Sequence, residues 1–79
     1  MQATAAERPR VMPSVGPGVQ EIRIHTGAEH RVFYIAKLAE AVYVLHAFEK
    51  RTQRTPQHDL DLARHRLRLL LNQRACRKG

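Results

Sequence analysis

The sequence contains little of what several protein classes require. It has a single cysteine, Cys76, so it can form no internal disulfide, and no cysteine pair is present for a zinc ribbon. No apolar run approaches about 18 residues, which excludes a predicted membrane-spanning helix. Its five histidines show no metal-ligand spacing, so we expect neither a metal nor another cofactor. Residues 1–10 lack the apolar segment of a secretory signal, and we expect a cytoplasmic protein.

Positive charge is what the sequence does have. The chain has 79 residues, enough for one small domain with a thin core. Lys and Arg number 14 against 7 Asp and Glu, and eleven of the 14 are arginines. Arginine holds phosphate with a planar, two-pronged donor fork. The composition therefore points to RNA, DNA or an acidic protein as partner, with a solvated basic surface as the alternative.

Residue patterns predict three strands after an irregular start. Residues 1–18 contain proline and glycine without an apolar period, which predicts a disordered tail over 1–12 and a turn at 14–18. Ile22 and Ile24 alternate with polar residues as in a half-buried strand, and residues 30–36 and 41–48 supply two more strands. Links of about four residues favour an antiparallel meander. In the third strand, alternation places four side chains on one face: Val42, Val44, His46 and Phe48.

A helix is the clearest local prediction. Thr55 is a good N-cap and Pro56 suits the first helical turn. The apolar positions that follow form one stripe: Leu60, Ala63, Leu67, Leu70 and Leu71. The helix should end near Arg74, leaving 76–79 as a frayed tail. Leu62 and Leu69 point away from the stripe, either as scattered surface leucines or as a partner-binding ridge. The predicted fold class is therefore α+β, a three-stranded antiparallel sheet with a C-terminal helix.

Candidate chemistry is confined to cationic and phenolic groups on or beside the strands. Ser14, the only serine, lies in the turn and has no nucleophile motif, and Cys76 reads as an incidental thiol. The remaining candidates are Arg23, Arg31, Tyr34, Tyr43, His46, Lys50, Arg51 and Arg54. Such groups suit cleavage of an RNA phosphodiester by its own 2′-hydroxyl, with cations stabilising the charge at phosphorus and His or Tyr moving protons. The alternative is core aromatics, an inward-facing histidine and a hydrated cationic rim.

Three ordered motifs carry a family resemblance. They are Gly-x-x-Glu-Ile-Arg at 18–23, Arg-x-x-Tyr at 31–34, and Leu-x-x-Phe-x-Lys-Arg-Thr-x-Arg-Thr-Pro at 45–56. Over about residues 13–73 the chain resembles the phage-derived toxin family of the RelE/ParE superfamily, close to HigB-type toxins. The resemblance implies a shortened RelE-like core and a bacterial type II toxin–antitoxin system. Its toxin is typically an endoribonuclease, an mRNA interferase that acts on mRNA at the ribosome, and a helix-turn-helix antitoxin masks it.

The resemblance also implies site residues and partners. Arg31, Tyr34 and His46 are then catalytic candidates, and the RNA-binding candidates are Arg23, Lys50, Arg51 and Arg54. Compared with the family, the chain looks N-terminally shortened, with a toxin domain over 13–75, and the C-terminal Tyr or His of some relatives has no counterpart. It is read as an mRNA interferase or its truncated remnant, the alternative being a non-catalytic module that binds an antitoxin or nucleic acid. Because one helix covers only one sheet face, we expect a homodimer or dependence on the antitoxin.

Overall fold

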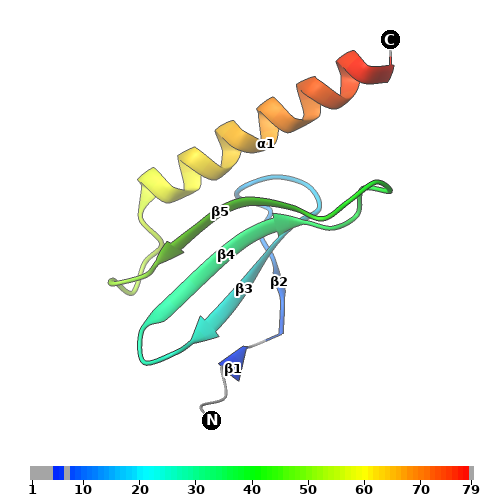
Figure 1. Ribbon diagram of the computed structural model, residues 1–79. Helices are drawn as coiled ribbons and strands as arrows, with labels where there is room; N and C mark the ends of the chain where they lie inside the picture. The colour runs from blue at the N-terminus through cyan, green and yellow to red at the C-terminus, as the bar shows by residue number, and fades with distance from the viewer. Residues whose placement is uncertain (1–4, 7, 79) are drawn as a thin grey trace.

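The computed structural model, which describes residues 5–6 and 8–78, is an antiparallel sheet with one long helix (Figure 1). The elements in chain order are β1 (Ala5–Ala6), β2 (Arg10–Val11), β3 (Val19–His25), β4 (Glu29–Ile35), β5 (Tyr43–Glu49) and α1 (Gln57–Lys78). The three long strands form the expected meander, with β4 between β3 and β5. Among the described residues, no helix combines the length and apolarity needed to cross a membrane.

The sheet is wider than the three strands predicted. Both short strands pair antiparallel with the outer edge of β3, β1 through Ala6 opposite Ile24 and β2 through Val11 opposite Gln20. Because they pair with successive parts of one strand, β1 and β2 together fill a fourth position in the sheet. They lie within the segment predicted to be a disordered tail, of which residues 1–4 and 7 fall outside the described part of the chain.

The two hairpins differ in regularity. β3 and β4 pair over their full length and turn through Gly27, whose φ of 93° is in the left-handed region that glycine adopts readily. Between β4 and β5 the register shifts after Phe33, which pairs with His46 while Tyr34 pairs with Val44. Leu45 is the extra residue of this β-bulge. The bulge reverses the alternation along β5, so Val44 lies on the opposite face from His46, contrary to the prediction that both share a face.

The core lies between the sheet and the first half of α1. Its buried apolar residues are Val15, Val19, Phe33, Ile35, Leu45, Ala63 and Leu67. Val15 comes from the 13–18 turn, which folds back so that the Met12 amide donates to the Val19 carbonyl at 2.8 Å. A Cβ at Gly16 would collide with the Leu67 side chain, so glycine permits this close approach. The helix is anchored to the turn by Arg64, whose Nε donates to the Ser14 carbonyl at 2.6 Å.

Helix α1 begins where predicted and ends later. The Pro56 carbonyl accepts bonds from the amides of Asp59 and Leu60 at 3.0 and 3.3 Å. The helix continues to Lys78, beyond the predicted end near Arg74, and Gly79 lies outside the described residues. Arg74 donates twice to the Glu40 carboxylate, at 2.6 and 3.1 Å, and so fixes the second half of the helix to the β4–β5 loop. Leu71, predicted in the buried stripe, is exposed, whereas its neighbour Leu70 is the residue that packs against the core.

Candidate nucleic-acid interface

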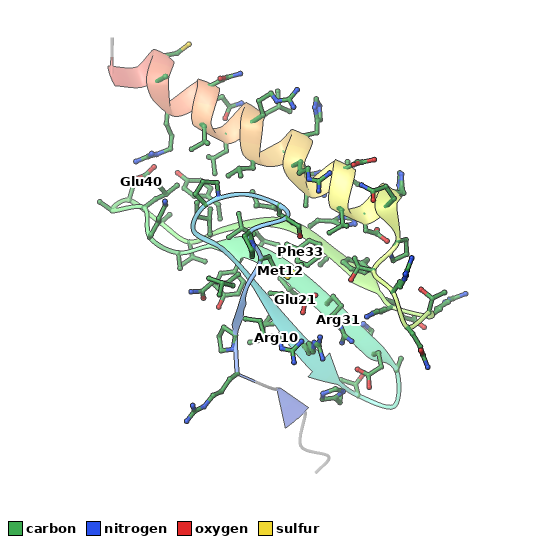
Figure 2. All side chains as sticks on the ribbon, turned by 180° about the vertical axis from the view of Figure 1, so that it is seen from behind. Arg10, Met12, Glu21, Arg31, Phe33 and Glu40 are labelled. Carbon is green, nitrogen blue, oxygen red and sulfur yellow. The ribbon has the colours of Figure 1, made fainter. Side chains whose placement is uncertain are left out.

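Charged side chains gather on the helix side of the sheet, at the end of β3 and β4 furthest from the apolar core. We call this group the cationic cluster; it consists of Arg10, Arg23, Arg31 and Lys50 with the carboxylates Glu21 and Glu29. Strand register explains the gathering. Arg10 lies opposite Glu21, Arg23 lies opposite Arg31, and the Lys50 amide donates to the Glu29 carbonyl at 2.7 Å. Figure 2 shows Arg10, Glu21 and Arg31 at this end, with Phe33 nearer the helix.

Glu21 is the buried acid at the centre of the cluster. It is only 3% exposed, and its two oxygens face different arginines. Arg23 Nε lies 3.2 Å from Oε1, and Arg31 Nε lies 3.8 Å from Oε2. Two arginines in direct cross-strand register would repel each other, so the buried carboxylate is what allows them to lie side by side.

Arg31 is nearly as buried as Glu21, with 6% exposure. Its Nη1 donates to Glu29 Oε2 at 3.2 Å, whereas its Nε is buried without a hydrogen-bond partner. A hydrogen bond from His25 and the nearby Arg31 hold the pKa of Glu29 below its usual value. The guanidinium is therefore oriented by two carboxylates and retains an unused donor.

Lys50 completes the cluster from the end of β5. Burial, followed by the charges of Arg31 and Arg23, lowers the pKa of its ammonium group. Four cationic side chains face two carboxylates, an excess of two positive charges. An anion bound here would relieve that excess and lower the repulsion among the cations.

The two tyrosines that were candidates for proton transfer do not lie in the cluster. Tyr34 lies on the opposite face of the sheet from Arg31, where its hydroxyl donates to Gln20 Oε1 at 2.9 Å. Tyr43 is the first residue of β5, at the opposite end of the strand from Lys50, and its hydroxyl donates to Glu40 Oε2 at 3.3 Å.

His46 lies on the helix side of the sheet with both ring nitrogens engaged. Arg66 Nη1 can only donate, and it lies 3.2 Å from Nδ1, so Nδ1 is the acceptor. Nε2 then carries the proton and donates to Asp59 Oδ1 at 2.7 Å. The ring also stacks on Phe48, with centroids 5.1 Å apart. Arg66 Nη1 donates in addition to the Leu45 carbonyl at 3.0 Å. These contacts join β5 to the first turns of α1.

Comparison with known protein families finds one family model that matches most of the chain. The sequence model of the family described as Phage derived protein Gp49-like (DUF891) matches residues 1–68. The chain belongs to this Gp49-like family. The phage-derived assignment made from the motifs is thereby confirmed, and it covers all five strands together with the first half of α1. Neither a curated protein nor a solved structure matches the chain.

Two further predicted RNA contacts of this Gp49-like chain lie in the β5–α1 loop, outside the cluster. Arg51 is exposed and its Nε lies 3.5 Å from Glu49 Oε1. Arg54 is also exposed, and its carbonyl accepts a bond from the Thr52 hydroxyl at 2.6 Å. Arg51 follows Lys50 directly and Arg54 lies four residues after it, so they extend the positive charge along the loop.

Sequence reasoning missed three members of the cluster: Arg10, Glu21 and Glu29. Arg10 falls in the segment predicted to be disordered, and only pairing of β2 with β3 brings it opposite Glu21. Glu21 did carry a signal, because it is two residues from Arg23 in a strand and therefore on the same face. Within the described residues, no group of three His, Cys, Asp or Glu side chains could hold a metal ion.

Proposed function

We propose that this Gp49-like chain acts on RNA as a toxin, an endoribonuclease of the RelE/HigB-like mRNA interferase type. One observation carries the proposal: the cationic cluster has two more positive than negative charges and contains Arg31, whose buried Nε has no hydrogen-bond partner. A phosphodiester supplies both the negative charge and the acceptor oxygens that such a site lacks.

The cluster suits transfer of a phosphodiester to its own 2′-hydroxyl. In this reaction the 2′-oxygen loses its proton and bonds to phosphorus, while the bond to the 5′-oxygen breaks and that oxygen receives a proton. The products are a 2′,3′-cyclic phosphate and a free 5′-hydroxyl. Arg31 and Arg23 would stabilise the additional charge on the phosphorane oxygens. Burial and the charges of the neighbouring arginines lower the pKa of Lys50, and this makes its ammonium group the better proton donor in the cluster.

RNA binding at several salt concentrations tests the interface. Lys50→Ala combined with Arg23→Ala should weaken binding of a single-stranded RNA and reduce the salt slope by about 0.7 for each phosphate that the protein no longer neutralises. The matched control is Arg68→Ala, because Arg68 is an exposed arginine on α1. An unchanged slope in the double variant would exclude the cluster from the interface.

Cleavage is tested separately from binding. Arg31→Gln should abolish cleavage of mRNA and growth arrest, because a neutral amide cannot stabilise the phosphorane charge. His46→Gln should leave cleavage intact provided that circular dichroism shows the fold is kept. Cleavage by the Arg31 variant at the parent's rate would overturn the catalytic assignment.

A non-catalytic module that binds nucleic acid or an antitoxin is the second candidate. It is favoured by the placement of Tyr34 on the opposite face and by the engagement of both His46 nitrogens. Under this candidate, RNA binding depends on the cluster but no cyclic phosphate is formed at any protein concentration.

The family resemblance adds two proposed partners. These are mRNA on the ribosome and a cognate helix-turn-helix antitoxin encoded beside this chain. Co-expression with the neighbouring small reading frame tests the second, because a cognate antitoxin would restore growth and co-purify with the chain.

A further inference from the structure

The face of the sheet turned away from α1 is apolar, which is unusual for a sheet face without a covering element. We call it the far face; its apolar side chains are Val11, Ile22, Ile24, Val32, Tyr34, Val44 and Ala47. An antiparallel sheet with one face in water normally carries polar residues there. In Figure 1, no helix or strand formed by residues 5–6 and 8–78 passes in front of the long strands on this side. Val11 and Val44 are 72% and 62% exposed.

Charge is nearly excluded from the far face. Five Asp, Glu, Arg or Lys side chains lie on the three long strands, and only Glu49 is on this side. The polar groups near the middle satisfy one another, since the Tyr34 hydroxyl donates to Gln20 at 2.9 Å. A face of this kind loses little when water is removed from it, because few polar groups would be left without partners.

The molecule also exposes more surface than its size requires. Its accessible surface is 5791 Å², whereas a compact monomer of 9.1 kDa exposes about 4,900 Å². A standard protein interface takes ~800 Å² from each partner, which is a small part of this surface. The shape agrees, because the molecule extends 47 Å in one direction and only 17 Å in another.

We propose that the far face is the dimerisation surface of this protein and that its occupant is a second copy of the chain. The two sheets pack face to face about a twofold axis, as in a β-sandwich. A second copy fits better than an acidic partner, because such a partner would bind through charge and the far face offers almost none. Each copy carries a net charge of +7, so two copies repel each other. Packing through the far faces keeps this repulsion low, because the cationic clusters then lie on the outer sides of the dimer.

Sedimentation equilibrium over micromolar concentrations tests the proposal. The parent protein should sediment at twice its chain mass and dissociate on dilution. Val44→Glu should be a monomer, because the dimer would bury an unpaired carboxylate in each copy. The side chain is exposed in the single chain, so the variant should fold. A parent protein that stays monomeric at every concentration would overturn the proposal.

Leu69→Glu is the matched control, because Leu69 is a 46% exposed leucine on the outer side of α1. It should leave the dimer intact. If Leu69→Glu dissociates the dimer and Val44→Glu does not, the interface is the helix ridge and the far-face assignment is wrong. The proposal does not depend on the proposed function, since Val44→Glu should retain the salt dependence of RNA binding while losing the dimer.

Discussion

The two faces of the sheet come from the same strands but have opposite chemistry. The helix side combines a buried apolar core around Phe33 with a charged end, in which Glu21 and Arg31 are buried while Arg10 and Glu29 are exposed. The far face has neither a buried core nor a charged end, and it is apolar and open. Because side chains alternate along each strand, the two faces of one sheet have different roles. One face holds the fold together and presents positive charge, and the other remains available for association.

The largest expected difference between the faces is in core packing. Phe33→Ala should lower the free energy of unfolding by about 3–5 kcal/mol, because the ring is fully buried and contacts Phe48 edge to face. Val44→Ala on the far face should change it by less than about 0.5 kcal/mol in the monomer. Urea denaturation at low protein concentration measures both. Similar losses in the two variants would mean that the far face is already packed within one chain.

Buried charge should give the next largest effect. Glu21→Ala should cost about 3 kcal/mol, because it leaves Arg31 buried beside Arg23 without the carboxylate between them. Glu49→Ala is the control, since Glu49 faces the other side and its contact with Arg51 is exposed. Urea titrations at low and high salt measure the loss. A cost below that of Glu49→Ala would show that Glu21 does not hold the cluster together.

The link between β5 and α1 should matter less. Asp59→Asn should lower stability by about 1.5 kcal/mol, because it replaces a charged acceptor that holds His46 at 2.7 Å. Asp61→Asn removes the same charge from the same end of the helix, but Asp61 is exposed. Thermal unfolding of both variants separates the hydrogen bond from the helix-dipole effect. Equal losses would assign the whole effect to the dipole.

The smallest expected effect concerns pH and the second half of α1. Hydrogen bonds from Arg74 lower the pKa of Glu40 from 4.5 to about 2 in the folded protein. Its contribution to stability is therefore present above pH 4.5 and is lost as the pH falls toward 2. Glu40→Gln should be slightly less stable than the parent at pH 6, and the difference should vanish near pH 2. Both side chains are partly exposed, so the effect should also weaken in salt. A difference that stays constant from pH 6 to 2 would contradict it.

Much of the fold is predictable because its signals are local. Alternation at Ile22 and Ile24, the β-branched and aromatic run that contains Phe33, and the Thr55-Pro56 helix start are local signals of this kind. They placed the second and third long strands and the start of the helix within two residues, whereas the end of the helix lies four residues beyond the prediction. The predicted buried stripe of the helix is confirmed at Ala63 and Leu67, which are both buried.

What could not be predicted depends on pairing between distant segments. No residue marks the bulge at Leu45, so alternation assigned Val44 to the wrong face. The strands β1 and β2 are two residues long and exist only because β3 offers an edge. The cluster was found in part, through Arg23, Arg31 and Lys50, whereas Arg10 entered it only by cross-strand register.

The hydrogen bond from Arg66 to the edge strand β5 bears on how chains of this protein associate at high concentration. β5 is the outermost strand on its side, and a bare seven-residue strand is a template on which further chains can add and grow into fibres. The guanidinium of Arg66 occupies the Leu45 carbonyl in the middle of that strand, where the bulge also interrupts the backbone spacing. A foreign strand meeting this edge would have to share that carbonyl with the Arg66 guanidinium. One helix side chain thus covers a backbone acceptor in the middle of an edge strand, where covering elements are expected to disfavour strand addition.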